Sequence, residues 1–434
     1  MEQLSIFWFR RDLRLDDNAG LYHALTDVNK VLPIFIFDTE ILEKLPSKKD
    51  ARVEMIHTAL GKLSDAMIEK KCNVGMYHGK PKAVFEKLLK KYSIKKVFTN
   101  HDYEPYARKR DEEIKKLLKK NGSDFETFKD QVIYEKLEIT KDDGLPYRVY
   151  TPYSKKWIEK MKTDGIPSYK SENHLQNLAS IIQPELELND LGFEKTNKPY
   201  PKYVLNRAII GNYEAIRNYP ALDQTSRTGY HLRFGTLSIR KMVSDASMSK
   251  NNTFLKELVW REFFMQILWH FPNTTSQCFK PKYERIEWRN NEDEFKKWCE
   301  GKTGYPFVDA GMRELNKTGF MHNRVRMLTG SFLCKHLLID WRWGEAYFAQ
   351  KLLDYEQSSN VGNWQWVAGC GVDASPYFRI FNPTQQIKKF DKKMEYIQRW
   401  VPEFQEITYP EPIVEHKFAR ERCLKTFKKA VNPE

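Results

Sequence analysis

The pattern of apolar and polar positions changes near residue 200. Before it, strand-like and helical patterns alternate, and after it only the helical pattern occurs. In the first part, short apolar runs such as SIFWF at 5–9 and KVLPIFIF at 30–37 alternate with amphipathic stretches such as 82–91 and 106–122. Strands that alternate with helices in this way are typical of a parallel sheet covered by helices on both faces. The pattern therefore predicts an α/β domain with a doubly wound parallel sheet at 1–132.

The second part of the chain carries only the helical period. Stretches such as 206–219, 238–247 and 253–270 repeat apolar residues every three or four positions. Between the two parts, polar and proline-bearing sequence interrupts both periods, as in a segment that joins two domains. The sequence thus predicts an interdomain connector at 133–200 and a larger all-α domain at 201–434.

Composition narrows the classes of function. The chain has 72 Lys and Arg against 58 Asp and Glu, a net charge of +14, and 14% aromatic residues, which together favour a polyanionic partner such as nucleic acid. The apolar runs all fall short of the ~20 residues that span a bilayer. The first residues, MEQLSIFWFRRD, run directly into charge without the layout of a signal peptide. We expect a cytoplasmic protein with no membrane partner.

The six cysteines are scattered singly, without CxxC or Cys/His spacing. That distribution predicts free, buried thiols and no metal site.

A charged segment, RRDLRLDDN, follows the first predicted strand. Its charges are Arg10, Arg11, Arg14, Asp12, Asp16 and Asp17. One interpretation is a solvated cluster of ion pairs at the strand end, and the other is phosphate binding at the carboxyl edge of the sheet. We favour the ion pairs.

The stretch 322–383 places charge among residues that otherwise form buried helices. Its charged residues include Arg324, Arg326, Arg342, Glu345 and Asp354, and a charge inside a core must be paired or bound to a ligand. Tryptophans stand at positions 341, 343, 364 and 366 of the same stretch. Aromatic core filling explains any one of them, but the set favours a planar aromatic ligand in a basic cavity.

Two further segments carry candidate chemistry. TSRTG at 225–229 is a hydroxyl- and glycine-rich turn that leads into a helix, which suits either phosphate binding or an ordinary helix cap. In ELVWREF, Glu257, Trp260 and Arg261 share one helix face at positions i, i+3 and i+4. They can point together into a cavity, or Glu257 and Arg261 can form a surface ion pair around the indole.

Taken together, these motifs resemble one family. WFRRDLRLDDN, ELVWREF, GYPFVDAGMREL, MHNRVRM, IDWRWGE and NWQWVAGCGVDASPYFRIFNPTQQ occur in this order over nearly the whole chain, and are similar to the photolyase/cryptochrome flavoproteins, closest to class I cyclobutane pyrimidine dimer photolyases. The resemblance implies FAD in the helical domain, ultraviolet-damaged DNA as the partner, light-driven dimer repair and a monomeric enzyme. It also implies a second antenna chromophore, either methenyltetrahydrofolate or a deazaflavin, with Glu104 at a position that contacts a folate.

The resemblance assigns roles residue by residue. The positions that contact FAD are Tyr213, Thr225, Ser226, Arg227, Thr228, Gly229, Arg326, Asp354, Tyr355, Glu356 and Asn360, with Arg326 and Asp354 as an ion pair and Asn360 facing flavin N5. The electron-transfer chain is Trp364 next to the flavin, then Trp341, then Trp298 toward solvent. The lesion and DNA positions are Arg217, Glu257, Trp260, Arg261, Asn323, Arg324, Met327, Trp366 and Gln386.

Some positions depart from the family pattern. Gly229 stands where serine is usual, and Phe320 stands where tryptophan is common. Two related functions remain as alternatives, a light-signalling cryptochrome and a six-four photolyase. Asn360 differs from the aspartate of plant cryptochromes, and Met327 favours the cyclobutane lesion over the six-four lesion.

Overall fold

The computed structural model describes residues 3–196 and 198–432, whose backbone divides into two compact units. The first unit comprises the chain up to Glu138 with Trp157–Tyr203 and Arg227–Met248. The second unit comprises Ile139–Lys156, Val204–Ser226 and the chain from Ser249 onward. The domain boundaries that the sequence suggested, 1–132, 133–200 and 201–434, stay a prediction.

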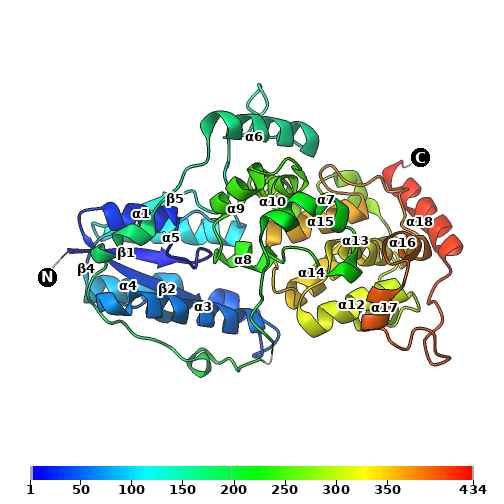
Figure 1. Cartoon of the computed structure of the whole chain (residues 1–434), viewed down its shortest axis with the longest axis horizontal. Helices are drawn as coiled ribbons and strands as arrows, with labels where there is room; N and C mark the ends of the chain where they lie inside the picture. The colour runs from blue at the N-terminus through cyan, green and yellow to red at the C-terminus, as the bar shows by residue number, and fades with distance from the viewer. Residues whose placement is uncertain (1–2, 197, 433–434) are drawn as a thin grey trace. The chain divides into compact units, whose positions relative to one another are not determined.

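The first unit contains the predicted parallel sheet. Its strands are β1 (Gln3–Phe9), β2 (Lys30–Asp38), β3 (Gly75–Gly79), β4 (Ser93–Asn100) and β5 (Asp124–Phe128), in the order β3-β2-β1-β4-β5. Every pairing is parallel, and the chain order changes direction at β1, with β2 and β3 to one side and β4 and β5 to the other. Figure 1 shows the helices of the first unit, such as α3 (Ala51–Met67) and α4 (Pro81–Lys91), beside these strands. The doubly wound sheet is therefore confirmed, while β5 was missed because its sequence, DFETF, is too short and polar to stand out.

Alternating side chains of β1 divide the two faces of this sheet. Ile6 and Trp8 belong to an apolar cluster with residues of α4 (Pro81–Lys91) and α5 (Pro105–Lys120). Phe7 points to the opposite face, where it lies against Gly20 of α1 (Ala19–Thr26). Helix α3 (Ala51–Met67) connects β2 to β3 and is also buried along one side.

The charged segment after β1 forms ion pairs, as we favoured, but with distant partners. Arg10 pairs with Asp111 at 2.6 Å, and Arg14 pairs with Asp130 at 2.8 Å. Asp17 pairs with a residue far along the chain, Arg240, at 3.0 Å. The expectation of a solvated cluster is wrong, since Arg14 is 5% and Asp17 2% exposed.

The second unit is built from helices. Its main elements are α7 (Arg207–Ile216), α10 (Thr253–His270), α11 (Glu292–Glu300), α12 (Pro306–Thr318), α13 (Asn323–Ser331), α14 (Trp341–Lys351), α15 (Gln357–Ala368), α16 (Pro383–Phe390), α17 (Glu395–Trp400) and α18 (His416–Val431). The described residues after position 201 contain no strand, so the all-helical prediction is confirmed. Two shorter helices, α8 (Gly229–Phe234) and α9 (Ile239–Ser247), belong to the first unit instead.

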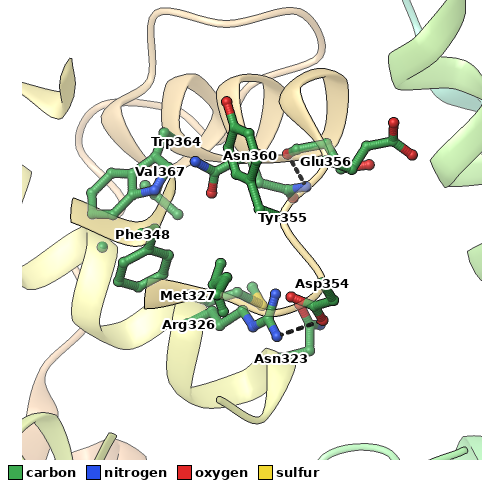
Figure 2. Close-up of a pocket in the computed structure, with 14 residues that line it drawn as sticks. Asn323, Arg326, Met327, Phe348, Asp354, Tyr355, Glu356, Asn360, Trp364 and Val367 are labelled. Atoms are coloured by element: carbon green, nitrogen blue, oxygen red, sulfur yellow. Dashed lines mark hydrogen bonds and ion pairs between the residues drawn. The ribbon is translucent and has the colours of Figure 1, made fainter. Parts of the chain in front are cut away.

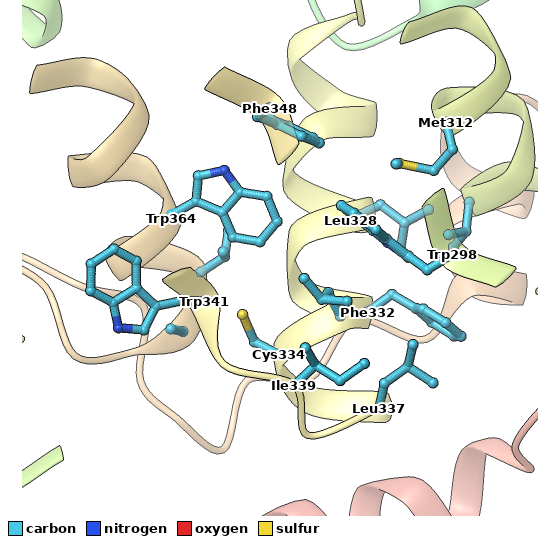
Figure 3. Close-up of a cluster of buried hydrophobic side chains, with 14 of the residues drawn as sticks. Trp298, Met312, Leu328, Phe332, Cys334, Leu337, Ile339, Trp341, Phe348 and Trp364 are labelled. Atoms are coloured by element: carbon cyan, nitrogen blue, oxygen red, sulfur yellow. The ribbon is translucent and has the colours of Figure 1, made fainter. Parts of the chain in front are cut away.

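The core of the helical unit lies around the apolar stretch that follows α13. Phe332–His336 forms a π-helical turn, and Phe332, Leu337 and Ile339 pack with Trp298, Trp341 and Trp364 (Figure 3). π-helical turns inside helices are often found at functional sites.

One further helix, α6 (Tyr150–Asp164), lies inside the segment predicted as a connector and was missed there.

The cysteines are free thiols, as expected, and all but the half-buried Cys299 are buried. Across the described ranges, no helix combines the length and apolar character needed to cross a membrane.

Candidate functional site

A cavity lies among α13, α14 and α15 of the helical unit, and we call it the Asp354 cavity. Its lining residues are Asn323, Arg326, Met327, Gly330, Phe348, Leu352, Asp354, Tyr355, Glu356, Ser359, Asn360, Asn363, Trp364 and Val367 (Figure 2). It holds about 110 Å³. Predicted cofactor positions Arg326, Asp354, Tyr355, Glu356 and Asn360 all come together in its wall.

The predicted pairing of Arg326 with Asp354 is present. Arg326 Nη2 donates to Asp354 Oδ2 at 2.9 Å, and Arg326 Nε donates to the Met321 carbonyl at 2.7 Å. Asp354 Oδ1 is buried and has no hydrogen-bond partner among the described residues. A buried carboxylate oxygen without a donor is costly unless a ligand supplies one, so this atom marks where a ligand donor belongs.

The Asn360 amide is held in one orientation. Its Nδ2 donates to the side chain and backbone of Glu345, at 2.9 and 3.1 Å, and Tyr355 Oη donates to the same carboxylate at 3.3 Å. Burial raises the pKa of Glu345, while these donors lower it. Because the amide nitrogen is committed to Glu345, Asn360 offers its oxygen to a ligand. The sequence pointed to Glu345 only as a buried charge and missed this supporting role.

A second cavity, which we call the Trp260 cavity, encloses about 330 Å³. Its lining residues are Arg217, Glu257, Trp260, Arg261, Phe264, Asn323, Met327, Ser359, Asn363 and Trp366. Most of the residues predicted for the lesion are therefore brought together, whereas Arg324 and Gln386 are not in its lining. Phe264, Ser359 and Asn363 were missed, because nothing in their sequence spacing marks them as cavity residues.

The two cavities adjoin. Asn323, Met327, Ser359 and Asn363 line both of them. A ligand in the Trp260 cavity is thus separated from a ligand in the Asp354 cavity by no more than the side chains of one shared wall.

The carboxyl group of Glu257, in the wall of the Trp260 cavity, has a raised pKa and an ion pair with a distant residue. It forms an ion pair with Arg217, and Arg261 pairs with Glu356 at 3.5 Å, so the alternative pair of Glu257 with Arg261 is not the one observed. Burial raises the pKa of Glu257, and the Arg217 charge opposes that shift. About a third of the side chain, 31%, stays open, which places the carboxyl group within reach of a cavity ligand.

Positive charge gathers beside the Trp260 cavity. Arg324 Nη2 donates to Asn218 Oδ1 at 2.5 Å, and the Arg324 guanidinium lies 4.3 Å from the centre of the Phe390 ring. Burial and the nearby charges of Arg217 and Arg379 lower the pKa of Arg324. Gln386 lies on α16, the helix that also carries Phe390.

The three tryptophans of the predicted electron-transfer chain belong to one buried cluster (Figure 3). The rings of Trp298 and Trp364 are 6.1 Å apart at 70°, and Trp341 is 1% exposed. Trp298 is 0% exposed, so its expected place toward solvent is wrong. The family resemblance supplied this placement, and a matching sequence motif does not report how exposed a side chain is.

A half-buried tryptophan that the sequence analysis missed lies next to the segment that carries Trp341. Trp288 packs on the edge of the same cluster. The Arg289 N–H donates to the Leu338 carbonyl at 2.7 Å, and the Asp340 N–H donates to Asn290 Oδ1 at 2.9 Å. These bonds fix the segment after Trp288 against residues just before Trp341.

The remaining predicted positions lie outside the Asp354 cavity lining. Tyr213 on α7 contacts Phe254 edge-on at 5.1 Å, and burial raises its pKa to about 12. The segment Thr225–Gly229 is divided between the two units after Ser226, and its Arg227 has a φ of 52°. Glu104 of the first unit pairs with Arg11 at 3.0 Å and Arg233 at 2.9 Å. The binding roles of these residues stay predictions.

Comparisons with known proteins agree on one family. Residues 5–171 match the family model described as DNA photolyase, and residues 254–408 match the model described as the FAD binding domain of DNA photolyase. A deoxyribodipyrimidine photo-lyase of Halobacterium salinarum is 33% identical, with 99% of this chain and 100% of the relative covered. One of Escherichia coli is 34% identical, with 98% of each chain covered.

Solved structures give the same picture. A class III photolyase from Agrobacterium tumefaciens superposes with a TM-score of 0.88 at 32% identity, covering 99% of this chain and 98% of that one. A photolyase from Sulfolobus tokodaii, described with two FAD molecules, has a TM-score of 0.83 at 33% identity, covering 98% and 100%. A cryptochrome from Synechocystis has a TM-score of 0.85 at 25% identity, covering 98% and 99%.

Proposed function

We propose that this chain, which belongs to the DNA photolyase family, uses light and bound FAD to split cyclobutane pyrimidine dimers in ultraviolet-damaged DNA. The observation that carries this proposal is the pair of adjoining cavities that share Asn323, Met327, Ser359 and Asn363. One cavity has the chemistry for a cofactor and the other has the chemistry for a flipped base pair, so the two ligands come close enough for direct electron transfer.

The polar groups in the lining of the Asp354 cavity suit the flavin of FAD. Asp354 Oδ1, buried without a partner among the described residues, would accept a hydrogen bond from the cofactor, while Arg326 holds the other carboxylate oxygen in an ion pair at 2.9 Å. Asn360 presents its amide oxygen because Glu345 holds the amide nitrogen. FAD, when bound and reduced, supplies the electron that opens the dimer on illumination. The family resemblance adds Tyr213 and the segment 225–229 as contacts for the rest of the cofactor.

The Trp260 cavity suits a pyrimidine dimer that has been turned out of the duplex. Trp260 and Trp366 provide indole walls, against which bases stack. Burial raises the pKa of Glu257, so this group takes up a proton at a higher pH than an ordinary glutamate. In that protonated form, which gives up the ion pair with Arg217, it can donate a hydrogen bond to a dimer carbonyl oxygen. That donor stabilises the negative charge that develops on the dimer during cleavage.

Arginines on the rim of the Trp260 cavity seat the DNA backbone. Arg217 and Arg261 line the cavity and Arg324 lies beside Arg217. Guanidinium groups form strong charge-assisted bonds with phosphates and hold a duplex in register without reading its sequence. Gln386 on α16 completes the predicted DNA contacts.

Buried tryptophans return the bound cofactor to its reduced state. Trp364 lines the Asp354 cavity and so starts the chain, and Trp341 lies in the same cluster. Because Trp298 is buried, we assign the solvent end to the half-buried Trp288 and keep Trp298 as a ring contact of Trp364. We further propose a monomeric, cytoplasmic enzyme with a second chromophore in the first unit.

Purified protein tests the proposed function in two steps. An absorbance scan identifies flavin, and illumination with duplex DNA that carries one cyclobutane dimer measures repair against a dark control. We expect light-dependent repair of that substrate and none of a matched six-four duplex. Repair of the six-four substrate alone assigns the chain to six-four photolyases, and stable flavin photochemistry without repair of either substrate assigns it to signalling.

A further inference from the structure

One face of the Trp260 indole is covered by another residue of the protein. The rings of Tyr150 and Trp260 are stacked at 3.6 Å with an interplanar angle of 6°. Phe263 meets the same indole edge-on at 5.6 Å and 81°. Phe264, which also lines the Trp260 cavity, lies 5.5 Å from the indole at 31°. Since Trp260 lines this cavity too, the part of the indole that Tyr150 and these two rings leave open faces a ligand there.

Tyr150 is itself held firmly. It is the first residue of α6 and is 9% exposed. Its Oη donates to the Lys256 carbonyl at 2.7 Å, one turn before Trp260 on α10, and its N–H donates to Asp373 Oδ2 at 3.1 Å. These two bonds tie the ring both to the helix that carries Trp260 and to the loop after α15.

We propose that Tyr150 is a positioning residue for lesion binding: its ring closes one face of Trp260 and fixes the indole plane, so that a pyrimidine dimer stacks on the opposite face. This inference rests on the proposed function. An indole free to rotate, or open on both faces, presents no single surface against which two joined pyrimidines can be held. Tyr150 prevents this rotation and covers one face of the indole, without contacting the lesion itself.

The alternative is that Tyr150 only fills space between α6 and α10. Tyr153 gives a matched case for that role, since it is 1% exposed and contacts Phe263 at 5.1 Å and 50°. A packing role predicts that changes at Tyr150 and Tyr153 act alike, through stability, and affect every form of DNA binding equally.

The test uses the full-length protein loaded with FAD and two duplexes of one sequence, with and without a single thymine dimer. Affinities are measured for Tyr150→Phe, Tyr150→Leu, Tyr153→Leu and Trp260→Leu, and for the double variant Tyr150→Leu with Trp260→Leu. Tyr150→Phe keeps the stacked ring, so we expect affinities close to wild type. Tyr150→Leu removes it, and we expect a roughly three- to tenfold loss of dimer affinity with unchanged affinity for undamaged DNA.

The double variant separates positioning from packing. If Tyr150 acts through Trp260, then Tyr150→Leu has no further effect on dimer affinity once Trp260 is leucine. Fully additive losses, or equal losses on both duplexes, overturn the proposal, as does a Tyr150→Leu protein indistinguishable from wild type. If Tyr150→Leu does not fold, Tyr150→Met carries the same comparison. A wild-type protein that does not prefer the dimer duplex overturns the proposed function instead.

Discussion

Gly344 on α14 is predicted to be the residue that gives Trp364 its place in the wall of the Asp354 cavity. A Cβ atom at Gly344 would lie 2.1 Å from Cη2 and 2.4 Å from Cζ3 of Trp364, and 2.6 Å from Leu333 Cδ2. Trp364 is 3% exposed and contacts Phe348 at 4.9 Å. The indole can therefore yield only by moving other core side chains or by moving into the Asp354 cavity that it lines.

The cost of Gly344→Ala follows from two opposing effects. Overpacking a close-packed core lowers the free energy of unfolding by about 1–3 kcal/mol. Replacing glycine by alanine within a helix raises it by roughly 0.5–1 kcal/mol. The difference of these two ranges runs from about 0 to 2.5 kcal/mol, so we expect a net loss of about 1 kcal/mol in the free energy of unfolding. Since the displaced side chain lines the Asp354 cavity, FAD content and flavin photoreduction should also fall.

Gly211→Ala is the matched control. Gly211 lies in the middle of α7, and a Cβ atom there has no neighbour within 4 Å among the described residues. In this variant the free energy of unfolding should rise by roughly 0.5–1 kcal/mol, and the FAD content should stay normal. Urea unfolding and flavin absorbance measure both variants. A Gly344→Ala protein that is stabilised like Gly211→Ala and photoreduces normally would refute the packing argument.

Other predictions concern the chemistry. Burial raises the pKa of Glu257, so repair yield should fall as pH rises through that pKa; Glu257→Gln should remove this fall and Glu257→Ala should lower the yield at every pH, as quantum-yield profiles will show. Trp364→Phe should abolish steady photoreduction of oxidised flavin but leave repair by chemically reduced enzyme intact. Asp354→Ala should weaken FAD retention roughly tenfold or more in equilibrium dialysis, because Arg326 loses its charged partner. Arg324→Gln should reduce the slope of log affinity against log salt by about 0.9 on any duplex, if it contacts one phosphate.

The fold was largely predictable because its determinants are local. Short apolar runs such as KVLPIFIF and the helical pattern of 253–270 agree with β2 and α10 almost residue for residue. The helix α6 was missed because polar and proline residues around Tyr150–Asp164 mask its period. In the folded protein, the burial of Tyr153 and Trp157 stabilises this helix despite its weak local preference for helical structure.

The candidate site was predictable in its residues but not in its partners. Spacing placed Glu257 and Trp260 on one face, and both line the same cavity. It could not show that Glu257 pairs with Arg217, forty positions earlier, because ion pairs across a fold leave no periodic signal. Exposure is equally non-local, so the sequence selected the buried Trp298 instead of the half-buried Trp288 for the solvent end.

Single-flash repair tests the central claim most directly. Chemically reduced, FAD-loaded protein is saturated with DNA that carries one cyclobutane thymine dimer, and restored thymines are counted after each flash of blue light. We predict repair that accumulates with flash number, is absent in the dark, and is strongly reduced in Trp260→Leu without loss of FAD. Unchanged dimer content after many flashes, in protein shown to hold reduced flavin and to bind the damaged duplex, would contradict the account.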